Sequence, residues 1–228
     1  MKLDGRLQAV AAFVPAGSRA ADIGTDHAYL AMALLLERGA ASVIASDKNA
    51  GPCQAARHTL QAAGIADRIA VRQGDGLTVL KPGEADTLCL AGMGGELITL
   101  LLAAAPQIVA GACRLVLQPM NDVPLVRRWL YVHGWHLTAE RLAEADGRLY
   151  VVLLAEPGMT ALPEPVLLTL GPCLWQEKPP LFSRYVTELY ERDRQALAGM
   201  EKSERMRQEP RYLALRQELQ DLEGKLQW

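Results

Sequence analysis

The chain has 228 residues, half of them hydrophobic, and a formal net charge of −2 at pH 7. This length is enough for one well-buried α/β domain with roughly seventy residues left over, and no stretch reaches about 18 apolar residues without a charge or turn former, so a membrane span is excluded. The near-neutral charge neither favours nor excludes a nucleic-acid partner, which would need a local basic patch.

The N-terminus and the cysteines indicate a cytoplasmic protein. Asp4 and Arg6 lie in what reads as a short amphipathic helix, which is not a secretory signal. The cysteines lack the spacing of metal ligands, so we interpret them as reduced core thiols and expect no metal site. They are Cys53, Cys89, Cys113 and Cys173.

Short apolar runs alternate with helical stretches over most of the chain. Because strands alternating with helices of about ten residues form parallel βαβ units, we expect a sheet covered on both faces. The predicted strands are Ala20–Gly24, Ser42–Asp47, Ile69–Gln73, Thr87–Ala91, Arg114–Gln118, His136–Leu142 and Tyr150–Ala155; the predicted helices are Ala28–Arg38, Pro52–Ala63, Glu96–Ala105 and Pro124–His133.

The last two predicted strands have no helix between them. Turn formers at 145–147 connect them, which predicts a closing antiparallel hairpin. Five parallel strands followed by a hairpin are typical of Rossmann-like class I methyltransferases and not of dehydrogenases. The predicted fold class is therefore α/β, with a doubly wound, mostly parallel seven-stranded sheet.

The character of the chain changes after Pro157, where prolines punctuate a connecting region before a polar, helical segment at 181–228. Leucines at 215, 219, 222 and 226 form a seam suited to a coiled-coil-like hairpin with a helix at 181–200, and Glu209-Pro210 marks the entry to the second helix. We expect a catalytic domain at 1–157 and a small α-helical domain at 158–228.

Two interpretations of the C-terminal hairpin stay open. It is either a solvated hairpin packing on the catalytic domain or on a second copy, or an element that grips a large substrate by arginines meeting phosphates. The sequence leaves both a monomer and a homodimer open. The arginines are Arg184, Arg192, Arg194, Arg205, Arg207, Arg211 and Arg216.

The first predicted strand ends in an acid, a glycine turn and a helix start. Gly24 allows close backbone approach to a ligand, and the amides that open the next helix bind a carboxylate or phosphate. Only the first glycine of G-x-G-x-x-G is present, so the amino-acid end of S-adenosylmethionine fits better than a pyrophosphate. His27, beside this turn, is either a base or an orienting side chain.

Two more acids end the next two strands. Asp47 is placed to accept both hydrogen bonds of a ribose diol, or else to cap the helix that follows. Asp75 is placed to accept the amine of an adenine, although Gly-Asp-Gly is also an ordinary turn. With Asp22, three acids at successive strand ends predict a pocket for an adenosyl ligand.

Glycines crowd the end of the fourth strand. Three of the four residues at 92–95 are glycine, which indicates either close approach of backbone to cofactor and substrate or a tight strand–helix turn. The fifth strand ends in Gln118-Pro119-Met120-Asn121-Asp122, which presents amides and an acid to the same region.

At these residues the sequence resembles the bacterial tRNA adenine-22 N1-methyltransferase family. The resemblance runs from Arg6-Leu7 to Tyr150 and continues more loosely into the C-terminal helices. Its most specific motifs are ADIGTDHAYL at 21–30, ASD-x-N-x-GP at 45–52, DGL at 75–77, AGMGG at 91–95 and LQP at 117–119. It implies S-adenosyl-L-methionine as cofactor and tRNA as substrate.

The resemblance also implies a role for each strand end. The methionine part of the cofactor lies at Asp22, Gly24, Thr25, Asp26, His27 and Ala28, its ribose at Asp47 and Lys48, and its adenine at Asp75 and Gly76. Gly92, Met93, Gly94 and Gly95 border the reacting methyl. Ala91, Gly92, Met93 and Gly94 are expected to bind the cofactor, and Gly95, Gln118 and Pro119 the substrate. Where the family usually reads Gln-Pro-Asn, this chain has Met120, with Asn121 one position later.

The expected reaction is in-line transfer of the sulfonium methyl to N1 of an unpaired or extruded adenine in folded tRNA. Asp26, Asn121 and Asp122 are candidates to stabilise the charge that develops on the base. Arg127 and Arg128 either contact phosphates or lie on a solvated helix face. The alternatives are a small-molecule or protein methyltransferase and a non-catalytic nucleotide-binding regulator.

Overall fold

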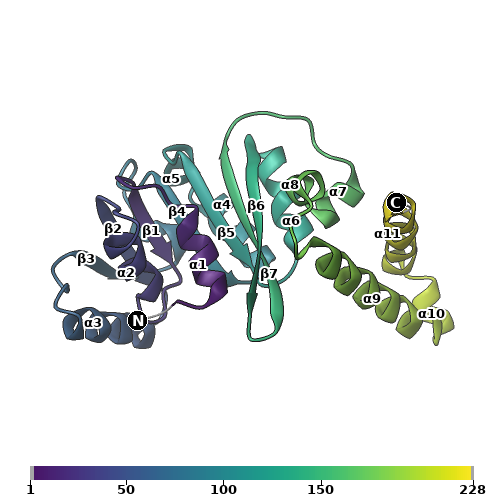
Figure 1. The fold of residues 1–228 in the computed structure, drawn as a ribbon, viewed down its shortest axis with the longest axis horizontal. Coiled ribbons are helices and arrows are strands. Elements are labelled where there is room, and N and C mark those ends of the chain that lie inside the picture. The colour runs from purple at the N-terminus through teal and green to yellow at the C-terminus, as the bar shows by residue number, and fades with distance from the viewer. Residues whose placement is uncertain (1–2, 227–228) are drawn as a thin grey trace. The chain divides into compact units, whose positions relative to one another are not determined.

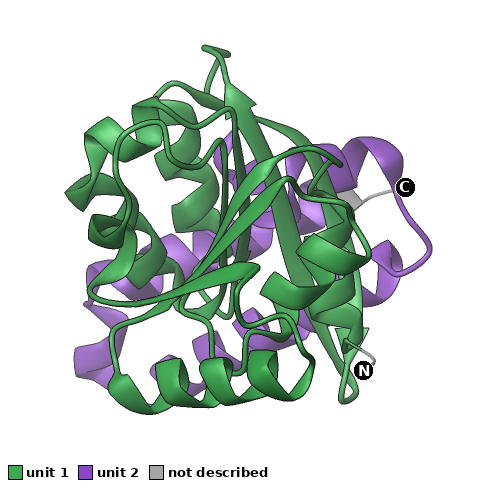
Figure 2. Ribbon diagram, turned by 90° about the vertical axis from the view of Figure 1, so that its left-hand side faces the viewer, with its two compact units in different colours: residues 1–162 green, residues 163–228 purple. Residues whose placement is uncertain are grey.

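The computed structural model describes residues 3–226 (Figure 1). The chain forms two compact units, residues 1–162 and residues 163–228 (Figure 2). The boundary follows Leu162, whereas the predicted domains divide after Pro157. Across the described residues, no helix is both long and apolar enough to cross a membrane.

One sheet of seven strands forms the centre of the first unit, in the order β3-β2-β1-β4-β5-β7-β6. β1 to β5 pair in parallel, and β7 is antiparallel to both β5 and β6. The predicted fold class and closing hairpin are thereby confirmed. The strands are β1 Arg19–Ile23, β2 Ser42–Asp47, β3 Ile69–Gln73, β4 Thr87–Met93, β5 Arg114–Pro119, β6 Trp135–Ala145 and β7 Arg148–Pro157.

Helices cover both faces of this sheet because successive strand residues point to opposite sides. α1, α2 and α3 share one apolar cluster with inward residues such as Cys89 and Val116, and α4 packs on β4, β5 and α6. Figure 1 shows α1 in front of the central strands. The helices are α1 Gly5–Ala12, α2 Tyr29–Leu36, α3 Ala50–Ala62, the 3₁₀ helix η1 Gly76–Val79, α4 Gly95–Ala104, α5 Pro106–Ala110 and α6 Val123–Val132.

The strand order reverses between β1 and β4. In open α/β sheets this reversal marks the place, at the carboxyl ends of the strands, where ligands bind. The predicted site residues lie at the carboxyl ends of these strands, in the segments that follow them, or on the helices that begin there. The topology therefore brings together segments far apart in the sequence.

The second unit is a helical assembly in which α9 and α11 contact each other and are joined by α10. Leu219 and Leu222 of the predicted seam are buried and Leu215 is half-buried, while the Leu226 side chain lies outside the described residues. The helices are α7 Pro165–Leu170, α8 Pro172–Glu177, α9 Phe182–Glu201, α10 Glu204–Arg207 and α11 Pro210–Leu226.

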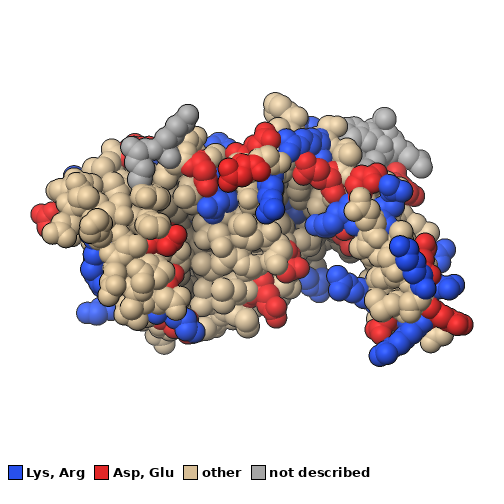
Figure 3. Space-filling model, turned by 90° about the horizontal axis from the view of Figure 1, so that it is seen from below, with Lys and Arg blue, Asp and Glu red and all other residues tan. Residues whose placement is uncertain are grey.

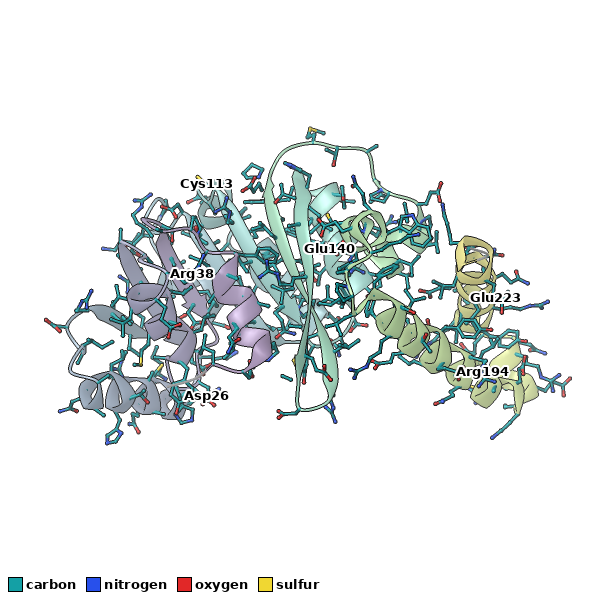
Figure 4. The ribbon with its side chains drawn as sticks, in the orientation of Figure 1. Asp26, Arg38, Cys113, Glu140, Arg194 and Glu223 are labelled. Atoms are coloured by element: carbon teal, nitrogen blue, oxygen red, sulfur yellow. The ribbon has the colours of Figure 1, made fainter. Side chains whose placement is uncertain are left out.

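All four cysteines are free, but they are not all core residues. Cys53 and Cys89 are buried, Cys173 is half-buried and Cys113 is exposed. Cys113 directly precedes β5, at the end of the unit opposite Asp26 (Figure 4). The prediction of a core thiol is wrong for Cys113, because the apolar run that suggested it begins one residue later.

Candidate active site

The turn after β1 crosses to the end of β2. The amides of Gly24 and Thr25 both donate to the carbonyl oxygen of Ser46 at 2.8 Å. Gly24 has φ +83° and Ala28, which opens α2, has φ +57°. The N-cap of α2 makes no side-chain cap hydrogen bond, and in its first turn the Ala31 amide is already bonded to Asp22. The amides of Tyr29 and Leu30 are therefore the groups of this turn that suit an anion.

Asp22 is the acid beneath this turn, and it is almost wholly buried. Burial raises the pKa of its carboxyl to about 6, against the opposing effect of hydrogen bonds from the Thr25 hydroxyl and the Ala31 amide. The Thr25 hydroxyl also accepts a hydrogen bond from the Ala28 amide at 3.1 Å. Through these hydrogen bonds, Asp22 stabilises the conformation of the turn.

Asp26 and His27 lie on the outer side of the turn. The Asp26 side chain is 78% exposed, and its Oδ2 is 3.5 Å from Nε2 of His27. The His27 ring stacks on Tyr29 with 5.3 Å between ring centroids. Figure 4 shows Asp26 at the lower edge of the first unit.

The ends of β2 and β3 lie side by side. Oδ1 of Asp47 accepts from the Asn49 amide at 2.7 Å, and the N-cap of α3 is Asn49 itself. Asp47 is thus not the helix cap of the alternative interpretation, and its second oxygen has no partner among the described residues. Nζ of Lys48 lies 3.2 Å from Oδ2 of Asp75, and both side chains are mostly exposed.

β4 ends in a bulge at Gly92, where the register shifts between Ala91 and Met93. Gly92 has φ +77°, a left-handed conformation in which glycine avoids the cost of a Cβ. A Cβ on Gly24 would lie 2.7 Å from the thioether methyl of Met93. The end of β4 is therefore packed directly against the turn after β1.

Gln118 joins the ends of β4 and β5. Its Oε1 accepts from the Gly92 amide at 3.0 Å and from Nη1 of Arg6 at 2.8 Å, while Nε2 donates to the Pro119 carbonyl at 3.0 Å. Gln118 and Pro119 are both buried, so as placed they offer no surface to a substrate. The predicted direct contact is replaced by a role in holding the two strand ends together.

Arg6 reaches this network from α1 and was not among the predicted site residues. The only sequence signal for it is that the family resemblance begins there. Its contacts depend on the packing of α1 against β4, β5, β6 and β7, which no local motif encodes.

Arg127 and Arg128 differ sharply in environment. Nε of Arg127 lies 2.8 Å from Oε1 of Glu140, and both side chains are fully buried. The prediction that Arg127 contacts phosphates is therefore wrong, because its charge is used inside the unit between α6 and β6, where Figure 4 labels Glu140. Arg128 is exposed and stays a candidate.

Comparison with known proteins identifies the family. Residues 3–153 match a family model described as a methyltransferase domain. The tRNA (adenine(22)-N(1))-methyltransferase of Bacillus subtilis is 41% identical over 193 residues, which cover 82% of this chain and 81% of the relative. The chain belongs to the tRNA (adenine(22)-N(1))-methyltransferase family.

Solved structures of similar proteins agree with this membership. The m1A22 tRNA methyltransferase of B. subtilis superposes with a TM-score of 0.88 at 34% identity, covering 99% of each chain. Sp1610 of Streptococcus pneumoniae, solved in complex with S-adenosyl-L-methionine, superposes with a TM-score of 0.87 at 31% identity and covers 99% of this chain and 100% of its own. The predicted family, fold and cofactor are confirmed.

The departure from the usual family motif has a structural outcome. Met120 is 47% exposed, and its amide donates to the Met93 carbonyl at 2.9 Å. Asn121 supplies the side-chain amide, whose Oδ1 accepts from the Gly95 amide at 3.1 Å. In this member of the tRNA (adenine(22)-N(1))-methyltransferase family, the Asn121 side chain therefore holds the start of α4.

Proposed function

We propose that this chain transfers the methyl group of S-adenosyl-L-methionine to N1 of adenine 22 in tRNA. The observation that carries the proposal is its 41% identity, over most of both chains, to the B. subtilis enzyme named for that reaction. tRNA as substrate makes the cytoplasm the expected place of action.

The residues at the sheet edge fit the cofactor. The uncapped start of α2 and the glycine turn before it suit the carboxylate of the methionine part. The second carboxylate oxygen of Asp47 suits the ribose hydroxyls, and Asp75 with Gly76 suits the adenine. When bound there, the cofactor supplies an electrophilic methyl group.

The chain's own contribution to the reaction is orientation. N1 of neutral adenine is nucleophilic without a base, so holding it in line and excluding water supply much of the rate. The backbone at 92–95, free of most side chains, allows close approach of the base. Asp26 and Asp122 are exposed, and Asn121 keeps a second lone pair on its Oδ1; each offers an oxygen to the exocyclic amine as positive charge develops.

The second unit contains a candidate RNA contact. Arg184, Arg192 and Arg194 each pair with an acid on α9. We call residues 202–211, the segment around α10, the hairpin tip. By contrast with the arginines of α9, the cations of the hairpin tip have no acidic partner within 4 Å among the described residues. Its cations are Lys202, Arg205, Arg207 and Arg211.

Labelled methyl transfer tests the function. Unmodified bulk tRNA should take up label, and digestion should place it in N1-methyladenosine. A tRNA with guanine at position 22 should take up none. Absence of label in every tRNA would overturn the proposal, and cofactor binding without tRNA methylation would favour a small-molecule or protein substrate.

A further inference from the structure

We propose that Arg6 binds a phosphate of the RNA beside the target adenine. The inference rests on the proposed function, because it takes tRNA as the substrate. Arg6 lies on α1, yet its guanidinium reaches the carboxyl ends of β4 and β5. Nη1 lies 2.8 Å from Oε1 of Gln118 and 3.2 Å from the position a Cβ would take on Gly92, in the segment that borders the reacting methyl.

The guanidinium is held in place from two sides. Gln118 is buried and cannot turn away, because both ends of its amide are hydrogen-bonded. The guanidinium carbon also lies over the Tyr150 ring of β7, 5.9 Å from the centroid. The Arg6 side chain is 20% exposed, so it is ordered by packing before any ligand arrives.

Most donors of this guanidinium are still available. An arginine has five N–H groups in a fixed fork. Within the described residues, one donates to Gln118, and a second nitrogen is 3.5 Å from Oδ2 of the half-exposed Asp4, a long contact that contributes little in water. Such a fork matches the paired oxygens of a phosphate.

The position favours the RNA over the cofactor as the source of the anion. The cofactor carboxylate already has the uncapped start of α2 at the end of β1, whereas Arg6 lies toward β5 and β7. Figure 3, the view from below, shows that most of the surface at the left of the molecule is uncharged, with Lys, Arg, Asp and Glu side chains scattered over it.

The charge balance of the reaction points the same way. Methylation at N1 places a positive charge on the base. An unneutralised guanidinium near that base would oppose the transfer electrostatically. A phosphate bound to Arg6 cancels the guanidinium charge and fixes the nucleotide at the same time.

Two variants test the proposal, with tRNA binding and cofactor binding measured separately. Arg6→Ala should weaken tRNA binding and raise KM for tRNA about 10-fold or more, as expected for one charge-assisted contact. The slope of log K against log salt should become shallower by about 0.7 to 0.9. Arg6→Lys should keep the slope and recover only part of the affinity, because it lacks the fork. In both variants, affinity for S-adenosyl-L-methionine should stay within about twofold of the wild-type value. This change is well below the tenfold loss that corresponds to about 1.4 kcal/mol.

Controls separate a structural role from phosphate binding. Gln118→Glu would neutralise Arg6 in place and should reproduce the loss of salt dependence even if Arg6→Ala fails to fold. Arg141→Ala removes an exposed arginine that lies 5.0 Å from the Phe13 ring centroid and should leave tRNA binding unchanged.

The outcomes are distinct. Unchanged tRNA affinity in Arg6→Lys together with unchanged affinity and salt slope in Gln118→Glu would overturn the proposal. A loss of cofactor affinity alone would also overturn it, because it would assign Arg6 to the cofactor carboxylate. If the wild type binds tRNA but does not methylate it, the proposed function fails while the Arg6 variants are still judged by binding.

Discussion

Asp22 shows how one residue combines structural and electrostatic roles. Its folded pKa of about 6 lies above the unfolded 3.8, so the native state binds this proton more tightly than the unfolded chain. The stabilising contribution is therefore complete below pH 3.8 and is lost as the pH rises through 6. The difference corresponds to about 3 kcal/mol of unfolding free energy.

Asp22→Asn should remove this pH dependence while keeping an acceptor for Thr25 and Ala31. Compared with the wild type, the variant should gain up to about 3 kcal/mol between pH 4 and pH 8. Urea unfolding of the ligand-free chain across this range measures the difference. The exposed acid variant Asp67→Asn serves as a control that should parallel the wild type; a parallel curve for Asp22→Asn would show that Asp22 titrates normally.

Substitutions of Asp47 test, also at the scale of a single residue, whether this side chain binds the ribose of the cofactor. Its half-buried side chain makes one hydrogen bond, to the Asn49 amide, so Asp47→Ala should cost about 1 kcal/mol of stability. Losing a bidentate acceptor for the ribose should weaken cofactor binding about 10-fold or more by calorimetry. Asp47→Asn, which keeps one acceptor, should fall between; unchanged affinity in both would mean that the ribose binds elsewhere.

At the scale of elements, the junction between β4 and α4 depends on glycine for space. A Cβ on Gly95 would lie 2.8 Å from the carbonyl oxygens of Asn121 and Asp122. Gly95→Ala should therefore push the segment after β5 away and destabilise the fold by about 1–3 kcal/mol. Gly51→Ala in α3 meets nothing within 4 Å and should stabilise by about 0.5–1 kcal/mol. Thermal unfolding compares the two; equal effects would contradict the steric argument.

At the scale of the whole molecule, the hairpin tip tests whether the second unit contributes to RNA binding. Replacing Arg205, Arg207 and Arg211 with glutamine should weaken tRNA binding and reduce the salt slope by about 0.7 to 0.9 for each phosphate that is no longer neutralised. Arg184→Gln with Arg194→Gln, which removes two paired arginines, should change binding little. Filter binding over a range of salt gives both slopes, and identical slopes in the two variants would leave the tip without a role in RNA binding.

Local patterns in the sequence determined the seven strands, the longer helices and the residues at the strand ends, but not the short helices α5, α7 and α8. Apolar runs punctuated by glycine and acids depend only on neighbouring residues, which is why such runs predict the seven strands and the turn at Gly24. The family motifs extended that prediction to the cofactor and the reaction.

Only the tertiary structure decided which side chains face the site. The sequence suggests that Arg127 is a surface cation, but α6 packs against β6 and places Arg127 opposite Glu140. The sequence suggests that Gln118 contacts the substrate, but its amide oxygen joins Gly92 to Arg6. These pairings link residues far apart in the chain, and their energies depend on burial and distance, which a linear pattern does not contain.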